Sequence, residues 1–315
     1  MLCGGCAGRC QVFPGARQLV TSYRSVSVLT LVRGRQQHLD HLVAGLETQT
    51  FPPDELVIAY MQDDAPQIET TGMFPVRYVQ VPGEPMPLAA ARNRAAEMAA
   101  GDVLAFLDVD CIPDPDFVRR AAEGHAFDTN GVFLPEVRYL PGTDTDWLDQ
   151  KTGAPDFQLL LSTGVRHPSK RPLDDASFLP ITYFGELWGL AFILSAKIWH
   201  AAGGMDEDYI GYGAEETDLG RRLERSGARM YWLGGTICFH QHHHVHKPPL
   251  QHFESIIRNA RLFRSRWGEW CMQYWLDDFE RRGLVKRSEE KLEIVRRPTE
   301  CEVADTRQGA EVLFS

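Results

Sequence analysis

The sequence predicts an α/β fold in which a mostly parallel central sheet is flanked by helices on both faces. In the first third of the chain, short apolar segments rich in β-forming residues alternate with segments of helical periodicity, in the order β-α-β-β-α-β. One predicted strand runs directly into the acidic triplet Asp108-Val109-Asp110. Ligands bind beyond the carboxyl ends of the strands in such sheets, so this strand end is the first candidate for a functional site.

Composition agrees with one large folded domain that carries extensions. The chain has 315 residues, of which 43% are hydrophobic and 24% charged, as in ordinary globular proteins. Its net charge of −10 argues against binding to nucleic acid or to an anionic membrane, because both need a basic surface. No apolar run approaches the roughly 18–20 residues that cross a bilayer, so we expect no membrane-spanning segment.

Residues 1–24 are expected to form a flexible leader. Three of the seven cysteines lie there, Cys3, Cys6 and Cys10, and the C-x2-C-x3-C spacing is compatible with a metal site that would still need a fourth ligand. The segment lacks the pattern of a signal peptide. A reducing cytoplasm is the simplest interpretation of the unpaired cysteines.

The segment from residue 25 to residue 140 carries the clearest pattern of strands and helices. Its first helix has apolar residues at the i, i+3, i+4 and i+7 spacing of one buried face, and a later Ala-rich helix stops at Gly101. The expected elements are a strand at Ser25–Leu31, a helix containing Leu39, Leu42, Val43 and Leu46, strands at Glu55–Tyr60 and Val76–Val81, a helix at Pro87–Ala100 and a strand at Val103–Leu107.

The second half of the chain begins with an irregular stretch, residues 141–180, which we expect to be a long loop that faces substrate. Residues 250–283 are expected to be helical, as the main part of an extension over 251–295, and 296–315 to be a disordered tail. Between them we expect a strand at Leu187–Leu194, a helix from Ser195, the loop Gly203–Tyr212, a helix at Ala214–Ser226 and strands at Arg229–Leu233 and Thr236–Phe239.

The acidic triplet is a candidate metal site. Alternate side chains of a strand share a face, so Asp108 and Asp110 can point to the same side. Two carboxylates at a strand end suit Mg²⁺ or Mn²⁺ that bridges a diphosphate. The alternative is a solvated turn between strand and loop.

A histidine cluster follows the last predicted strand. Five of the seven residues from His240 to His246 are histidines, and neutral imidazole is a good ligand for Mn²⁺ or Zn²⁺. We expect at least one of them to bind a metal and the others to pack or to support the ligands.

Two further segments carry charged residues that suit catalysis or phosphate binding. The glycine-rich run before Glu215 and Glu216 places acids in the first turn of a helix, where a carboxylate can act as a general base or simply stabilise the helix dipole. Arg92 lies beside Asn93 on the helix before the acidic triplet, and its planar guanidinium suits a diphosphate. The alternative for Arg92 is a solvated helix face.

These motifs, taken together, resemble those of a family 2 glycosyltransferase with the GT-A fold and a galactosyltransferase-type C-terminal half. The stretch from SVSVLTLVRGR to VLAFLDVDCIPDPDF is similar to the nucleotide-sugar half, placed at 25–140. The stretch from FGELWGLAFILSAK through GGMDEDYIGYGAEETDL to TICFHQHHH is similar to the acceptor and metal half, placed at 181–250. The order of these motifs makes the resemblance specific, and it implies a GT-A domain over 25–250.

The resemblance also implies roles for single residues. Asp110 matches the direct metal ligand, and Asp108 matches a residue that also meets the ribose. His240 matches the late metal-binding histidine, with His243 as the next choice. Thr30, Arg33 and Asp63 match positions around the nucleoside, and with Arg92, Asn93 and Asp108 they form the expected nucleotide-sugar set.

For the acceptor side, the resemblance implies that Glu216 is the catalytic base, since the second acid of the pair usually is. This chain has Glu where the family commonly has Asp, so the choice between Glu215 and Glu216 stays open. Glu215 and Asp218 are expected to contact the acceptor sugar or to brace the helix. Trp188 and Gly189 match the acceptor platform.

The implied activity is an inverting transfer from a nucleoside diphosphate sugar to a hydroxyl of a glycan or small molecule, with Mn²⁺ or Mg²⁺ as cofactor. A UDP-sugar is the expected donor, and galactose is one candidate sugar. Alternatives are a nucleotidyltransferase, a catalytically silent sugar- or metal-binding protein, and a histidine-rich metal store. A processive synthase would need membrane helices and a Q-x-x-R-W motif, of which only Arg266-Trp267 is present.

Overall fold

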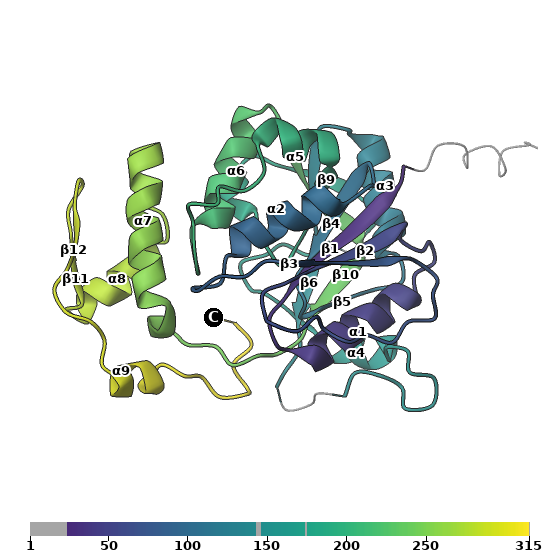
Figure 1. The fold of residues 1–315 in the computed structure, drawn as a ribbon, viewed down its shortest axis with the longest axis horizontal. Coiled ribbons are helices and arrows are strands. Elements are labelled where there is room, and N and C mark those ends of the chain that lie inside the picture. Colours follow the sequence, from purple (N-terminus) through teal and green to yellow (C-terminus); the bar gives the residue numbers. More distant parts are fainter. Residues whose placement is uncertain (1–23, 143–145, 174, 315) are drawn as a thin grey trace, which may run out of the picture.

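The computed structural model describes residues 24–142, 146–173 and 175–314. Their main feature is a ten-stranded sheet in the order β3-β2-β1-β4-β9-β6-β10-β5, with β7 and β8 paired to β6 and β10 (Figure 1). The expected leader, residues 1–24, and with it Cys3, Cys6 and Cys10, lies almost wholly outside the described residues.

The N-terminal half of the sheet is parallel, as the sequence predicts. Strand β1 (Val26–Val32) pairs in parallel with β2 (Glu55–Tyr60) and β4 (Val103–Leu107), and β2 pairs in parallel with β3 (Val76–Gln80). Helix α1 (Gln36–Glu47) covers one face of these strands, and α2 (Leu88–Met98) covers the other. Apolar side chains of β1, β2 and β4 are buried on both faces, which explains their continuous apolar runs, whereas the edge strand β3 is partly exposed.

The other half of the sheet is mixed rather than parallel. Strand β9 (Ala191–Ser195) runs antiparallel to β4 and to β6 (Gly131–Tyr139). Strand β10 (Arg229–His240) is parallel to β6 but antiparallel to β5 (Cys111–Pro113) and β8 (Phe178–Ile181). The two-residue β7 (Val165–Arg166) pairs antiparallel with the end of β6.

Strand β10 also corrects an expectation, because the sequence predicts two short strands there. The register shifts between Leu233 and Ile237, so one strand passes through a bulge. Gly235 has a φ of +79°, which glycine adopts without strain. The carboxylate of Asp114 accepts hydrogen bonds from Thr236 and from the backbone of Ile237, and it thereby fixes the bulge.

The remaining helices of the domain cover both faces of the sheet. Helices α5 (Ala196–Ala202) and α6 (Glu215–Arg225) pack beside α2, whereas α3 (Phe117–Phe127) packs beside α1. The expected strand at Leu187–Leu194 begins only at Ala191, because the 3₁₀ turn η1 (Phe184–Glu186) precedes it. The stretch expected to be one long loop contains α4 (Phe157–Thr163), which the carboxylate of Asp156 caps.

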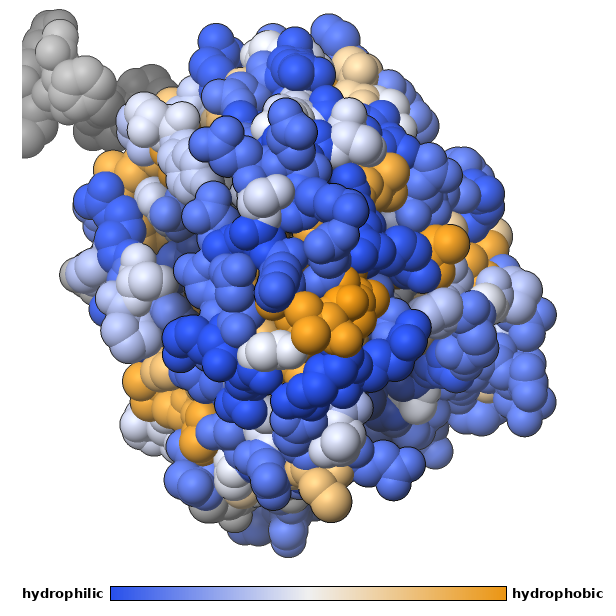
Figure 2. All heavy atoms as spheres, turned by 90° about the vertical axis from the view of Figure 1, so that its left-hand side faces the viewer, coloured by the Kyte–Doolittle hydropathy of each residue, from blue (hydrophilic) through white to orange (hydrophobic). Residues whose placement is uncertain are grey.

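The C-terminal segment forms a smaller core of its own beside the sheet (Figure 1). It comprises η2 (Leu250–His252), α7 (Phe253–Trp267), α8 (Gln273–Arg281) and a hairpin of β11 (Val285–Arg287) and β12 (Leu292–Ile294). This side of the molecule is mostly hydrophilic, with hydrophobic side chains gathered in a few separate places (Figure 2). None of the helices in the described part of the chain has the length and apolarity to span a bilayer.

The prediction of a disordered tail over 296–315 is wrong for most of that stretch. Helix α9 (Glu300–Asp305) begins with a capping box between Thr299 and Glu302. This local signal is not detected when helices are predicted from apolar periodicity alone. His246 bonds to the carbonyl of Val303 and the hydroxyl of Thr306, which ties the helix to the histidine loop.

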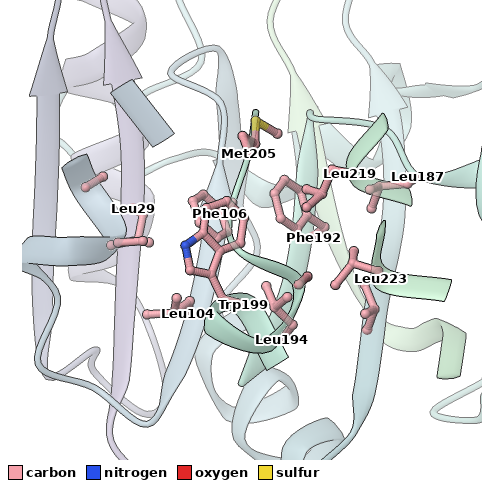
Figure 3. Packing of buried hydrophobic residues seen from close by; sticks show 14 of the residues in the cluster. Leu29, Leu104, Phe106, Leu187, Phe192, Leu194, Trp199, Met205, Leu219 and Leu223 are labelled. Carbon is pink, nitrogen blue, oxygen red and sulfur yellow. The ribbon is translucent and has the colours of Figure 1, made fainter. Parts of the chain in front are cut away.

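The core under the predicted functional strand is aromatic. Phe106 of β4 stacks on Phe192 at 4.5 Å between ring centroids and lies 4.6 Å from the ring of Trp199 (Figure 3). All three side chains are almost fully buried. This packing fixes β4, and β4 leads directly into Asp108.

We predict that Phe106→Ala destabilises the protein by about 3–5 kcal/mol, because it leaves a cavity in a close-packed cluster. Chemical denaturation followed by tryptophan fluorescence measures the loss. Tyr183→Ala is the control, since Tyr183 is 64% exposed, and it should change stability by less than about 0.5 kcal/mol. Equal stability of the Phe106 variant and the parent would contradict the importance of this cluster.

Candidate active site

Backbone pairing brings the acidic triplet and the histidine cluster together. His240 is the last residue of β10 and lies opposite Cys111, the first residue of β5. Directly after the end of β10, the backbone N–H of Gln241 donates to the carbonyl of Asp110 at 2.6 Å. Two segments 130 positions apart in the chain are thus held side by side by the main chain, before any side-chain contact is considered.

Asp110, His240 and His243 form a candidate metal site. The Nε2 atoms of His240 and His243 lie 3.5 and 3.6 Å from the two carboxylate oxygens of Asp110. One ligand atom from each residue falls within a mutual distance of 4.8 Å. Within the described parts of the chain, Oδ1 of Asp110 is buried and has no hydrogen-bond donor. A buried carboxylate oxygen without a donor, facing two imidazoles, suits a divalent cation.

Burial favours the neutral, metal-binding form of the two histidines at this site. It lowers the pKa of His240, and it lowers the pKa of His243 to about 4, so both rings are neutral near pH 7 and offer a lone pair. Burial opposes ionisation of Asp110, but His240, Arg35 and His243 together lower the pKa of that carboxyl. Arg35 also donates a hydrogen bond to Asp110, a contact that the sequence analysis missed.

The other histidines of the cluster have different surroundings. His242 packs against Gly142, His244 is exposed and His246 anchors α9. Two histidines of α1 support the ligand loop instead: His41 bonds to the side chain of Gln241 at 2.6 Å, and His38 bonds to the carbonyl of His242 at 3.1 Å. Sequence spacing gave no sign of them, because α1 lies far from the cluster in the chain.

A buried arginine links the acidic triplet to the acidic helix. Nη2 of Arg92 lies 3.1 Å from Oδ1 of Asp108 and 3.4 Å from Oε1 of Glu216. Its side chain is only 4% exposed, so the alternative of a solvated helix face is excluded. Among the described residues its Nη1 has no acceptor, which leaves one donor for a ligand. Burial raises the pKa of Asp108 to about 7, even though Arg92 opposes this effect.

The two glutamates of α6 occupy different environments. Glu215 is buried, and burial together with the charge of Glu216 raises its pKa to about 7. The Glu216 side chain is 31% exposed and lies against Gly189, where a Cβ atom would collide with its carboxylate. Glu216 is therefore the carboxylate that an external hydroxyl can reach, and Gly189 makes room for it.

Asn93 and Asp218 act within the protein. The Asn93 amide accepts from the backbone of Met205 and donates to its carbonyl and to Glu207. Both of its polar atoms thus have protein partners, which favours a bracing role over the expected contact with the nucleotide sugar. Asp218 is fully buried and accepts from Tyr209 at 3.3 Å and from Trp267 at 2.8 Å. Of the two roles expected for Asp218, the structure favours bracing the helix over contact with an acceptor.

Asn259 of α7 is a residue that the sequence analysis missed. It is fully buried, and its amide nitrogen points at the carbonyls of Ile210, Tyr212 and Gly213, the nearest at 2.8 Å. These carbonyls belong to the glycine-rich turn that precedes Glu215. That turn is held in an unusual shape, since Ala214 has a φ of +76°. A buried Asn in a predicted helix gives no sign of this role.

The expected nucleoside residues lie near the carboxyl end of β1 and in the loops beside it. Thr30 is buried, and among the described residues its hydroxyl has no hydrogen-bond partner. Arg33 pairs with Glu84, and both line a cavity together with Tyr212. Asp63 is exposed, and its charge raises the pKa of Arg33 after the larger effect of Glu84. The structure thus places Arg33 and Asp63 on one side of the site.

Trp188 borders a second cavity, which lies over β6. The ammonium of Lys170 sits 3.7 Å from the centre of the Trp188 ring, and it pairs with Glu186. His167 meets the same ring edge-on at 5.2 Å. One face of Trp188 is therefore already covered, which limits its use as a platform for an acceptor.

Comparisons with known proteins match this chain to glycosyltransferases. A model of glycosyl transferase family 2 matches residues 27–178, and a model described as the N-terminal domain of galactosyltransferase matches residues 179–247. Validoxylamine A glucosyltransferase of Streptomyces hygroscopicus subsp. limoneus is 24% identical over 231 residues, which cover 65% of this chain and 49% of that enzyme. Chondroitin synthase of Escherichia coli is 25% identical over 189 residues, which cover 55% of this chain and 27% of that protein.

The chain spans about half or less of the length of these curated relatives. A solved structure of GalNAc-T7 with UDP, GalNAc and Mn²⁺ superposes with a TM-score of 0.50 at 14% identity, over 70% of this chain and 43% of that one, which supports the GT-A fold. The two family models together cover residues 27–247, and the chain belongs to the family 2 glycosyltransferases, with a second half of the galactosyltransferase type.

Proposed function

We propose that this glycosyltransferase moves a sugar from a nucleoside diphosphate sugar, with UDP as the nucleotide, to a hydroxyl group of a glycan or small molecule, with inversion at the anomeric carbon. The observation that carries the proposal is the meeting of Asp110, His240 and His243 within 4.8 Å, next to the Asp108–Arg92–Glu216 chain. A candidate site for a divalent cation, and a partly exposed carboxylate that a buried arginine links to the acidic triplet, suit a displacement at a sugar diphosphate.

Asp110, His240 and His243 would hold Mn²⁺ or Mg²⁺. When bound, the cation would supply positive charge that stabilises the leaving diphosphate. Arg35 and Arg92 add protein charge at the same place, Arg35 beside Asp110 and Arg92 with one unused donor. A protein of net charge −10 needs such a local concentration of cations before it can bind an anionic diphosphate.

Glu216 is the proposed general base. Its carboxylate accepts the proton of the acceptor hydroxyl as the oxygen attacks the anomeric carbon, while the bond from that carbon to the diphosphate oxygen breaks. A single displacement of this kind inverts the configuration and needs no enzyme nucleophile. The guanidinium of Arg92 keeps Glu216 oriented toward the site.

A metal-binding test separates the proposed ligands from the other histidines. We predict that Asp110→Ala and His240→Ala each weaken Mn²⁺-dependent binding of UDP by at least about tenfold, whereas His244→Ala leaves it unchanged, because His244 is exposed. Isothermal titration calorimetry with UDP, in Mn²⁺ and in EDTA, measures this. If the protein were instead a histidine-rich metal store, the His244 variant would also bind less metal.

A second test concerns the base. Glu216→Gln should lower kcat for transfer by roughly 10²–10⁴-fold, because the amide cannot accept the proton, while UDP affinity in Mn²⁺ stays at the parental value. Glu224→Gln, an exposed change on the same helix, is the matched control. Wild-type turnover of the Glu216 variant would refute the assignment, and a comparable loss confined to Glu215→Gln would move it to Glu215.

A third test concerns the turn before the base. Asn259→Ala removes the buried amide that donates to the carbonyl of Gly213 and reaches that of Tyr212, which should cost about 1–3 kcal/mol and let the turn relax. We predict a lower kcat well below the melting temperature, with UDP affinity retained. Arg261→Ala on the same helix is the control, since the guanidinium of Arg261 donates to the carbonyl of Leu292, within the C-terminal segment. Equal losses in the two variants would indicate a purely structural effect.

A further inference from the structure

A segment near the end of the described chain returns to the candidate metal site. After α9, residues 306–314 run back toward the sheet (Figure 1), and a β-bridge between His246 and Arg307 pairs them with the loop that follows β10. We call residues 306–314 the strap and residues 241–247 the histidine loop. The strap lies beyond the residues that the two family models match, so its contacts with the site have to be interpreted from this chain alone.

The histidine loop is anchored on both sides of His243. Before it, the side chain of His38 in α1 bonds to the carbonyl of His242 at 3.1 Å. After it, the backbone N–H of Gln308 in the strap donates to the carbonyl of Val245 at 2.9 Å. Because one anchored residue precedes His243 and another follows two positions later, the path of the loop at His243 depends on both anchors.

His246 supplies a side-chain anchor next to the backbone one. Its Nδ1 atom lies 3.0 Å from the carbonyl oxygen of Val303 and 2.9 Å from Oγ1 of Thr306. The hydroxyl of Thr306 already donates to the carbonyl of Val303, so Nδ1 of His246 must carry a proton and donate. The carbonyl of Thr306 also accepts from the backbone of Lys247 at 2.9 Å. Thr306 is 2% exposed, so this end of the strap is shielded from water.

The other end of the strap reaches the surroundings of the second histidine ligand. The Phe314 ring meets the Tyr139 ring edge-on at 5.0 Å between centroids, and the Tyr139 ring lies 4.9 Å from that of His240. Between the two ends, the carbonyl of Ala310 accepts from the backbone of Gly142 at 3.0 Å. The strap therefore contacts residues that surround both histidines of the candidate metal site.

We propose that the strap is a positioning element of the metal site, which holds the histidine loop in the shape that turns His243 toward Asp110. The assignment rests on the cation site of the proposed function. Loss of the strap would remove the anchors at Val245 and His246, and the ring of His243 would then be free to leave Asp110. A His243 ring engaged by a cation would in turn restrain the loop, so metal binding and strap pairing stabilise each other, because such a coupling is reciprocal.

Binding of Mn²⁺ alone to the full chain tests the strap without any sugar chemistry. Electron paramagnetic resonance measures free Mn²⁺ during the titration. His246→Ala removes the donor to Val303 and Thr306, and it should weaken Mn²⁺ binding by about tenfold, as is typical when a group that supports a ligand is lost. His246→Asn offers an amide N–H in place of the Nδ1–H group and should keep most of the affinity. His244→Ala, an exposed change in the same loop, is the control with parental affinity.

Hydrogen exchange of the parent protein tests the same coupling without a variant. Mn²⁺ should slow exchange at the amides of Lys247 and Gln308, because both donate across the pairing of strap and loop. The amides of the β11–β12 hairpin, which pairs within the C-terminal segment, should exchange at an unchanged rate. Mass spectrometry of peptides that contain these amides measures both effects.

Parental Mn²⁺ affinity in a folded His246→Ala variant would overturn the proposal, as would equal losses in the alanine variants of His246 and His244. Exchange at Lys247 and Gln308 that does not respond to Mn²⁺ would overturn it too, and this measurement decides alone if circular dichroism shows that His246→Ala is unfolded. Failure of the proposed cation site looks different: the parent would then bind no Mn²⁺, and the strap would lose its role together with that site.

Discussion

The pairing of β5 with β10 is the constraint on which the rest of the site depends. It sets His240 opposite Cys111 and lets the backbone of Gln241 bond to Asp110, so the carboxylate and the imidazoles meet with little freedom to move apart. Holding ligands on strand ends, rather than on loops alone, reduces the entropy lost when a cation binds. The bulge fixed by Asp114 sets where along β10 this pairing falls.

Opposite charges offset one another among Asp108, Arg92 and Glu216, which lie near this pairing. Asp108 and Glu216 would repel each other in a low-dielectric site, and Arg92 lies between them with its guanidinium almost fully enclosed. The energetic cost of burying Arg92 is offset only while both carboxylates remain. The arginine therefore joins the acidic triplet on the metal side of the site to the glutamate on the base side.

The C-terminal segment is part of the active site rather than an independent appendage. Asn259 holds the carbonyls of the glycine-rich turn, and Trp267 donates to Asp218 in the first turn of α6. Arg266 adds ion pairs to Asp206 and Asp208, which lie in the loop that leads into the glycine-rich turn. Because the turn contains residues in left-handed conformations, contacts from outside are needed to keep it in one shape.

The sequence by itself determined the parallel half of the sheet, the position of Asp108 and Asp110 at a strand end, and the family, because these depend on local periodicity and on the order of motifs. It also singled out His240 and Glu216. Helix α9 was within reach of the sequence too, through its capping box, and was missed because its apolar periodicity is weak.

Only the tertiary structure decided which histidines meet Asp110, that Arg92 is buried between two carboxylates, that Asn93 braces a loop, and that Asn259 holds the glycine-rich turn. These features depend on contacts between segments far apart in the chain. Periodicity reports which face of a helix is buried, but it carries no information on what that face meets, so the partners of a buried polar side chain appear only once the elements are packed.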